Sequence, residues 1–293
     1  MNLQQLDIFH RFSKSRSVTR VAKELGLKQP TITFHLKKLE SDLGVKLYER
    51  VRDSIQLTAA GVTLNNYAGE IISLFNETER VMRDYQSSAR GELFLGASHI
   101  PANYLLPPVF SVFTNEKPNI QLNVQVASTP TIIDLIKEKQ LDIGIVSEQM
   151  LEDQALEIRR LVADDLALVI PFSHPLGKKD EIGLDDLVSE PFILHRSGST
   201  REVINRWLKE KDLQLSIKME LTNIEAIRRM VMLNSGLSIL SKRAVEEEAT
   251  AGRVKTAEVP ELEKNRYITL IYRKDRPITP VLQRFITELY KNL

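Results

Sequence analysis

The chain has 293 residues, of which 42% are hydrophobic and 27% charged, so it is long enough for about two globular domains and is neither disordered nor fibrous. It contains no cysteine, which excludes disulfides, thiol catalysis and cysteine metal sites. Residues 1–60 hold 11 Lys and Arg against 6 Asp and Glu, a net charge of +5, and residues 61–293 carry −4. This asymmetry predicts a polyanionic partner for the N-terminal end alone.

Targeting signals and cofactor motifs narrow the function classes further. The first 17 residues, MNLQQLDIFHRFSKSRS, predict an amphipathic helix and not a signal peptide, and no apolar run approaches the roughly 20 residues of a membrane span. The five histidines lack the spacing of metal ligands, and the sequence has no glycine-rich phosphate loop. We therefore expect a cytoplasmic protein with no membrane partner, no metal and no cofactor.

Three helices are predicted in the first 43 residues. The first has apolar residues every three positions, at Leu3, Leu6, Phe9 and Phe12. The second is expected at residues 18–25 behind Ser17, a plausible N-cap. Gly26 then marks a tight turn, and Pro30 suits the start of the third helix.

The third helix has two different faces. Its inward stripe consists of Ile32, Leu36, Leu39 and Leu43. Its outer face carries short polar groups, two lysines and a bare aromatic ring, which is typical of a helix-turn-helix that reads DNA. A solvated surface hairpin is the alternative for this segment alone. The residues that we expect to contact double-stranded DNA are Gln29, Pro30, Thr31, Thr33, Phe34, Lys37 and Lys38.

The residues that follow predict a wing. Apolar and polar residues alternate around residues 47–57, as in a small two-stranded ribbon. Arg50 and Arg52 lie on this ribbon, and we expect them to hold DNA phosphates together with the two lysines of the preceding helix.

The segment AKELGLKQPTITFHLKKLESDLGVKLYERVRDSIQLTAAG resembles the signature of LysR-type transcriptional regulators. It has, in order, a recognition helix that begins with QP, then LE, LG, LYER and LTAAG. Three positions depart from the family pattern. Lys28 stands where a capping Ser is usual, Phe34 where Arg or Gln is usual, and Asp53 where a basic residue is usual in the wing. The operator sequence therefore cannot be transferred from relatives.

A long linker helix is predicted from Thr58, a plausible N-cap, to the SSARG segment at 87–91, which we interpret as a hinge. Its seam alternates steps of three and four: Leu64, Tyr67/Ala68, Ile71, Leu74/Phe75, Thr78, Val81/Met82 and Tyr85. The first turns are expected to pack on the winged helix of the same chain. The rest of the seam predicts a homodimer, as does the family resemblance, and two dimers would form a tetramer.

The remainder alternates strands with helices, which predicts a parallel sheet with right-handed crossovers. Strands are expected at residues 93–97, 122–127, 141–146, 166–170, 191–194, 217–221, 235–240 and 266–272. A single helix is expected at about 101–114, and others follow the strands to residues 140, 207, 233 and 293.

The resemblance extends over this part in GELFLGAS, LLPP, LDIGIV, HPL, GLDDL, SGSTR and SGLSIL. It implies an all-α winged helix-turn-helix domain (1–58), a linker helix with hinge (59–90), and a pair of periplasmic-binding-protein-like α/β subdomains (91–293). The first subdomain would comprise about 91–163 and 266–293, and the second about 164–265.

Four predicted helices follow a strand with a hydroxyl residue at their start: Ser98, Thr129, Thr200 and Thr222. Open α/β sheets bind ligands at this edge, where helix N-termini offer N–H groups and partial positive charge. Ordinary N-capping is the alternative, and at Thr222 the two interpretations are balanced. Because the family senses metabolites there, we expect a small effector. We expect it to carry a carboxylate, because helix N-termini and hydroxyls converge there while no acidic cluster does, and Arg196 or Arg201 would be its charge partner.

The segment HRSGS at 195–199 resembles a nucleophile loop only superficially, because no G-x-S-x-G stands there. We therefore predict a LysR-type DNA-binding transcription factor that is not an enzyme, with RNA polymerase as a further candidate partner. The alternative is a helix-turn-helix fused to an enzymatic or transport-type solute-binding domain.

Overall fold

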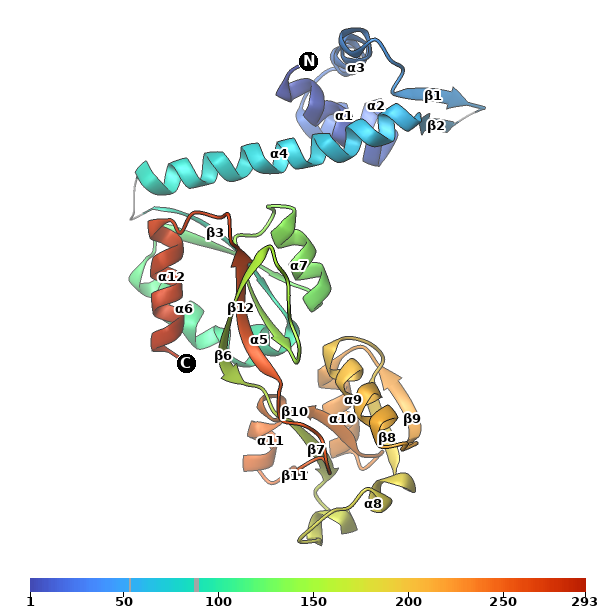
Figure 1. Ribbon diagram of the computed structural model, residues 1–293, viewed down its shortest axis with the longest axis vertical. Helices are drawn as coiled ribbons and strands as arrows, with labels where there is room; N and C mark the ends of the chain where they lie inside the picture. Colours follow the sequence, from blue (N-terminus) through green and yellow to red (C-terminus); the bar gives the residue numbers. More distant parts are fainter. Residues whose placement is uncertain (53, 87–89) are drawn as a thin grey trace. The chain divides into compact units, whose positions relative to one another are not determined.

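The computed structural model describes residues 1–52, 54–86 and 90–293. Its contacts divide the chain into two compact units: residues 1–83 with 138–140, and residues 84–137 with 141–293 (Figure 1). Asp53 and most of the predicted hinge at 87–91 lie outside the described residues. No helix in the described part of the chain is long and apolar enough to cross a membrane.

The N-terminal unit begins with three short helices, as predicted: α1 (Leu3–Ser15), α2 (Val18–Leu25) and α3 (Gln29–Leu43). Their shared core is formed by Ile8, Phe9, Phe12, Val21, Ala22, Ile32, Leu36, Leu39 and Leu47. Leu43, predicted in the same stripe, is 36% exposed because α3 ends at that residue.

The turn between α2 and α3 follows from its local chemistry. Ser17 accepts a hydrogen bond from the Arg20 N–H at the start of α2. Gly26 ends α2 with a left-handed φ of 64°, a conformation that glycine adopts without steric cost. Lys28 gives α3 no side-chain cap, as its departure from the family pattern predicts.

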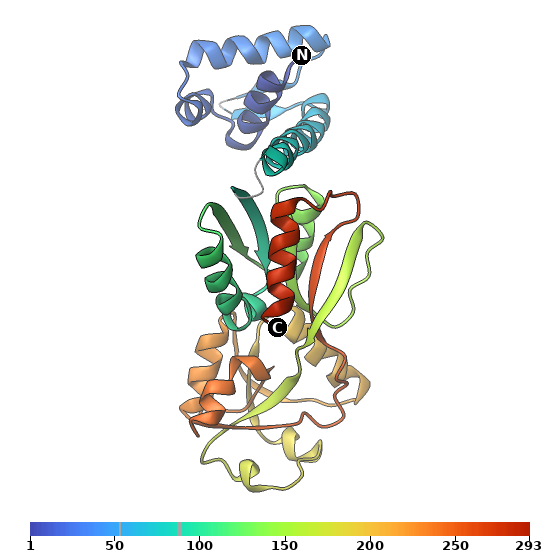
Figure 2. The ribbon, with the colours of Figure 1, turned by 90° about the vertical axis from the view of Figure 1, so that its left-hand side faces the viewer.

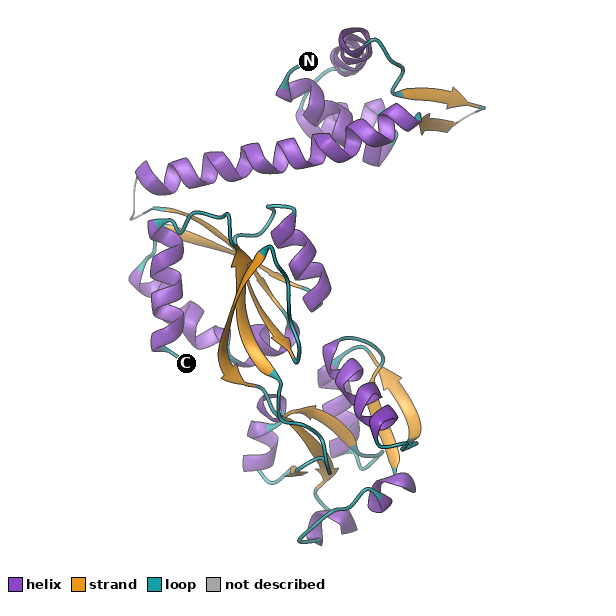
Figure 3. Ribbon diagram, in the orientation of Figure 1, coloured by secondary structure: helices purple, strands orange, loops and turns teal. Residues whose placement is uncertain are grey.

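The wing is a two-stranded antiparallel ribbon of β1 (Tyr48–Val51) and β2 (Ser54–Leu57), and Figure 3 shows it extending from the helices. Its base is fixed to α3 by the buried Glu40, which accepts hydrogen bonds from the Leu47 N–H (2.9 Å) and from Lys46 Nζ (3.2 Å). A buried carboxylate needs such partners, so Glu40 positions the wing and is not available to DNA.

The linker helix α4 (Ala59–Gln86) starts where the sequence predicts, because Thr58 Oγ1 accepts a hydrogen bond from the Gly61 N–H (3.0 Å). At Gly61, a Cβ atom would lie 1.9 Å from the Leu47 carbonyl oxygen, so only glycine allows α4 to approach the wing this closely. Leu64 and Ala68 pack inward, which confirms that the first turns dock on the winged helix.

The later turns of α4 leave apolar side chains in solvent. The exposed members of the predicted seam include Tyr67, Ile71, Leu74, Phe75 and Met82, and Leu74 is 50% exposed. A monomeric helix gains nothing from such a stripe, so this face needs a partner surface.

The second unit contains two subdomains. The first is built on a sheet in the order β4 (Ile120–Val126), β3 (Gly91–Ala97), β5 (Ile143–Glu148), β12 (Tyr267–Arg273) and β6 (Leu156–Ala163). Strands β4, β3 and β5 run parallel, whereas β12 is antiparallel to both β5 and β6. The sheet is therefore mixed and not wholly parallel, and β6 was not predicted.

Helices cover both faces of this sheet, as Figure 2 shows. One face packs on α5 (His99–Tyr104), α6 (Leu106–Glu116) and α12 (Pro280–Lys291). The other face packs on α7 (Thr129–Lys137). The single helix predicted at 101–114 is two helices, because Pro107 and Pro108 cannot donate the backbone hydrogen bonds that would continue α5.

The second subdomain packs around Trp207, whose indole N–H donates to the Pro260 carbonyl (2.9 Å). Its strands are β7 (Leu166–Pro171), β8 (Pro191–His195), β9 (Ser216–Leu221), β10 (Ser238–Ser241) and β11 (Val254–Ala257). Its helical segments are η1 (Pro175–Lys178), α8 (Asp185–Val188), α9 (Ser199–Glu210), α10 (Ile224–Met232), η2 (Lys242–Ala244) and α11 (Glu246–Thr250). Two chain crossovers, after β6 and before β12, join it to the first subdomain.

Candidate functional sites

The outer face of α3 is exposed and basic. A shallow depression there is lined by Lys28, Gln29, Pro30, Thr33, Phe34 and Lys37. Lys38 is exposed beside them, and Thr31 is partly buried at the flank. The residues selected from the sequence on this helix therefore lie on or next to one surface.

Phe34 is the unusual member of this surface, because it is a large apolar side chain that is 60% exposed. Its ring meets the His35 ring edge-on at 5.7 Å, and Lys38 Nζ lies 6.0 Å from its centroid. It is not packed into the domain core, so its ring is available to an external partner.

Both wing arginines are exposed at the β1–β2 end of the same unit. Arg52 has a left-handed φ of 55°, as a tight turn between two strands requires. A cationic ribbon next to a cationic helix is the arrangement by which a winged helix contacts a DNA backbone.

The second unit contains a cleft of about 440 Å³ between its two subdomains. Its lining is rich in hydroxyl groups: Ser98, Ser128, Thr129, Ser147, Ser197, Ser199, Thr200 and Thr222. All four hydroxyl residues singled out in the sequence are among them. The volume suits a small metabolite.

The wall from the first subdomain is a buried hydroxyl cluster. Ser98 Oγ accepts the Ser147 N–H (2.9 Å), and Thr129 Oγ1 donates to the Ser147 carbonyl (3.4 Å). The Ser147 hydroxyl is buried and has no hydrogen-bond partner among the described residues. Ser147 was not predicted, because it lies inside strand β5 and not at the start of a helix.

The four hydroxyl residues lie at or near helix starts, but ordinary N-capping, the alternative interpretation, is not what their side chains do. Ser98 is the N-cap residue of α5, although its side chain makes no capping bond. At α7 the capping hydroxyl is Ser128, which accepts from the Thr131 N–H, and at α10 it is the side chain of Asn223. Thr200 lies within the first turn of α9. In the described structure, none of the four hydroxyls is thus used as a helix cap.

The two arginines proposed as charge partners do not line the cleft. Arg201 forms an ion pair with Glu220 (2.8 Å) and donates to the His195 carbonyl (3.1 Å). Arg196 is exposed on the loop before α9. Sequence spacing placed both near the correct helix end but could not show the directions of their side chains.

The cation that does line the cleft is Arg266, at the crossover before β12. It is 4% exposed and forms an ion pair with the fully buried Asp164 (2.7 Å). Its second terminal nitrogen donates to Ser199 Oγ (3.2 Å). Burial lowers the pKa of Arg266, and Asp164 and Glu148 oppose that shift.

His195 also lines the cleft, and its imidazole is neutral near pH 7. Burial, followed by the charges of Arg266 and His99, lowers its pKa to about 4. Within the described residues, no hydrogen bond joins the His195 ring to a serine hydroxyl.

Comparison with known proteins identifies both parts of the chain. Residues 3–62 match a family model described as a bacterial regulatory helix-turn-helix protein of the lysR family. Residues 86–293 match a model described as the LysR substrate binding domain. Together these matches span the winged helix and the α/β unit.

Similar proteins extend over the same length. A probable RuBisCO transcriptional regulator of Trieres chinensis is 33% identical, over 98% of this chain and 96% of its own. Its counterpart in Thalassiosira pseudonana is 34% identical, over 99% and 98%.

Solved structures share the fold. Full-length CbnR complexed with its target DNA has a TM-score of 0.70 at 22% identity, with complete coverage of both chains. A full-length OxyR variant from Pseudomonas aeruginosa has a TM-score of 0.69 at 20% identity, over 100% of this chain and 94% of its own. The chain thus belongs to the LysR family and is a DNA-binding transcription regulator with an effector-binding domain.

Proposed function

We propose that this regulator senses a small, carboxylate-bearing metabolite in the cleft and changes its promoter contacts in response. The observation that carries the proposal is the cleft itself, because hydroxyls from both subdomains line one space of about 440 Å³. Ser98 and Thr129 would bind from the first subdomain and Thr200 from the second. A ligand that bridges the subdomains favours one arrangement of them, and only such a difference in affinity shifts a conformational equilibrium.

The lining favours an anion over a cation. Hydroxyl groups and the first turns of α7 and α9 meet at the cleft, and both bind carboxylate oxygens well. The acidic residue of the lining, Glu225, is already paired with Arg228 (2.5 Å) and Arg229 (3.2 Å). In the described part of the chain, no group of three His, Asp or Glu residues is placed to hold a metal ion.

On the DNA side, α3 would enter the major groove while the wing holds the backbone. Thr33, Phe34 and Gln29 would reach base edges, with Pro30 and Thr31 at the helix start. Lys37, Lys38, Arg50 and Arg52 would contact phosphates. The regulator would work in the cytoplasm, with RNA polymerase as a further partner at the promoter.

The exposed stripe of α4 would form the dimer, and two dimers a tetramer. Leu74→Asp places a charge in this stripe, and we expect it to split the dimer and abolish paired recognition of half-sites about one helical turn or a multiple apart. Asn76→Asp, which adds the same charge off the stripe, is the matched control. Sedimentation at micromolar concentration measures the outcome, and a Leu74→Asp protein that remains dimeric would place the interface elsewhere.

The alternative function is enzymatic catalysis or solute transport by a binding domain fused to the helix-turn-helix. Incubation with a metabolite pool, followed by mass spectrometry, detects turnover, while retention on promoter DNA at moderate salt detects regulation. We expect DNA retention without turnover. The relatives named as RuBisCO regulators supply the first promoter fragment to test.

A further inference from the structure

We propose that Arg266 binds the anionic group of the effector, which would replace the Ser199 hydroxyl as the acceptor of one guanidinium N–H. This inference rests on the proposed function, because it assigns the charge partner within the same cleft. Among the described residues, Arg266 is the only Arg or Lys that lines the cleft. It therefore takes the role that the sequence suggested for Arg196 or Arg201.

The Arg266 guanidinium has hydrogen-bond donors that its present partners do not use. One terminal nitrogen is paired with Asp164 (2.7 Å) and the other donates to Ser199 Oγ (3.2 Å), whereas the buried Nε has no hydrogen-bond partner in the described structure. Guanidinium can donate five hydrogen bonds, and a neutral hydroxyl is a weaker acceptor than an oxyanion. An anion at the start of α9 would therefore displace Ser199 and gain a charge-assisted bond.

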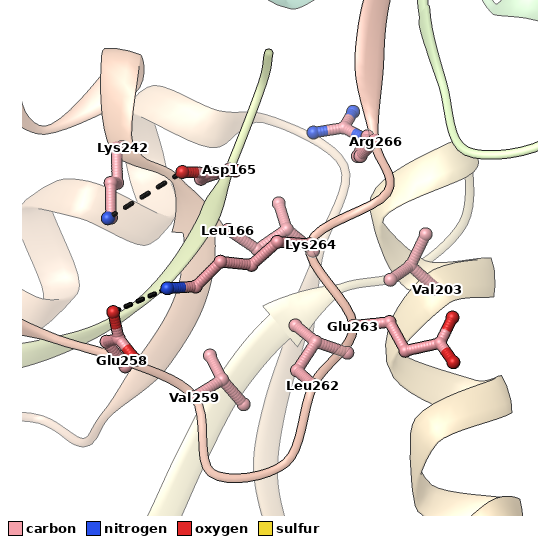
Figure 4. Close-up of a pocket in the computed structure, with 10 residues that line it drawn as sticks. All are labelled: Asp165, Leu166, Val203, Lys242, Glu258, Val259, Leu262, Glu263, Lys264 and Arg266. Carbon is pink, nitrogen blue, oxygen red and sulfur yellow. Dashed lines mark hydrogen bonds and ion pairs between the residues drawn. The ribbon is translucent and has the colours of Figure 1, made fainter.

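Arg266 lines two spaces, the cleft and a second, small cavity. Figure 4 shows that cavity, with Arg266 at the start of β12 and the ion pairs Lys242–Asp165 and Lys264–Glu258 among its lining residues. The small cavity has a volume of about 10 Å³, room for about one water molecule, so it cannot hold a metabolite. The large cleft is the space near Arg266 that can.

Asp164 is the positioning residue in this arrangement. It lies at the crossover after β6, and Arg266 lies at the crossover before β12. The Asp164 N–H also donates to the Arg266 carbonyl (3.0 Å), so backbone and side chains fix the pair together. An anion held by Arg266 thus acts on the two segments that connect the subdomains, which is where a change in their relative arrangement must originate.

The experiment is calorimetry on the full-length protein at constant ionic strength, with succinate and inorganic phosphate as probes and uncharged succinamide for comparison. Arg266→Gln alone would leave Asp164 buried without its partner, so the test variant combines Arg266→Gln with Asp164→Asn. Arg196→Gln removes a nearby arginine that does not line the cleft and is the control.

We expect the wild type to bind one of the two acids, and the double variant to bind it at least about tenfold more weakly. Binding of succinamide should not differ between the two proteins. Arg266→Lys, which keeps the charge, should recover part of the affinity, and Arg196→Gln should bind as the wild type does. The tighter of the two probes distinguishes a carboxylate from a phosphate ligand.

Equal affinity of the wild type and the double variant for the acid would overturn the role of Arg266 and leave the proposed function intact. So would a loss of affinity in Arg196→Gln as large as that in the double variant. A wild-type protein that binds neither acid would contradict the proposed anion-sensing function, and this inference with it.

Discussion

Replacing Phe34 with alanine tests the recognition surface most sharply. A phenylalanine side chain has about 200 Å² of surface, so the 60% exposed in this structure is roughly 120 Å². At about 25 cal/mol per Å², its complete burial against DNA would contribute about 3 kcal/mol. Contact with a thymine methyl buries only part of the ring, so we expect Phe34→Ala to weaken specific operator binding by about 1–3 kcal/mol.

The assay is fluorescence anisotropy with an operator duplex and a scrambled duplex of equal length and salt concentration. Phe172→Ala is the matched control, because Phe172 is 56% exposed but belongs to the other unit. We expect operator affinity to fall in Phe34→Ala alone, with the scrambled duplex and the melting temperature nearly unchanged. Equal losses on both duplexes, or a clear drop in melting temperature, would refute a role for Phe34 in sequence recognition.

Three further outcomes follow from the described contacts. Lys37→Gln should reduce the slope of log affinity against log salt by about 0.9 per subunit on any duplex, and an unchanged slope would remove Lys37 from the phosphate contacts. Gly61→Ala should lower the melting temperature sharply, because its Cβ would lie 1.9 Å from the Leu47 carbonyl oxygen. Gly69→Ala is the control, because its Cβ would meet only the His10 side chain, at 3.2 Å, and should change the melting temperature less. Equal drops in melting temperature would contradict this packing. Because the pKa of His195 is about 4 in the folded state against 6.5 unfolded, the unfolded chain binds more protons between these values. Stability should therefore fall by up to about 3 kcal/mol as the pH drops from about 6.5 to 4, and a His195→Gln protein with the same pH dependence would contradict the assignment.

The secondary structure of the N-terminal unit was predicted well, because it depends on residues that are close together in the sequence. The stripe of α3, the Gly26 turn and the Thr58 cap all depend on residues within one or two helical turns. The function of Glu40 was less visible. Its hydrogen bond from the Leu47 N–H forms only once the wing folds back on α3, so no local pattern indicates it.

The cleft between the subdomains was predictable in part. Hydroxyls after strands lead to Ser98, Thr129, Thr200 and Thr222, which all line it, because ligand clefts lie at the carboxyl edge of the strands in this class of fold. Arg266 could not be found this way. It precedes a strand, and it reaches the cleft only because β12 returns from the second subdomain and pairs antiparallel with β5.

The antiparallel return also explains the error in sheet type. Alternating strands and helices predict parallel pairing, but β6 and β12 are the two strands through which the chain leaves and re-enters the first subdomain. Their direction depends on the crossovers, which are a tertiary feature. The break between α5 and α6 could have been predicted from Pro107 and Pro108 but was not.

The link between the cleft and DNA is tested most directly by measuring both in one pair of proteins. Wild type and Thr129→Val are titrated with succinate by calorimetry, and DNA footprints are recorded with and without the acid. Valine keeps the shape of Thr129 and removes the hydroxyl, so we expect Thr129→Val to bind succinate more weakly than the wild type. Without succinate, the footprints of the two proteins should be the same. Succinate should change both footprints, but the variant should need a higher concentration than the wild type. A ligand that binds both proteins equally, or that binds the wild type and leaves its footprint unchanged, would contradict the site or its coupling to DNA.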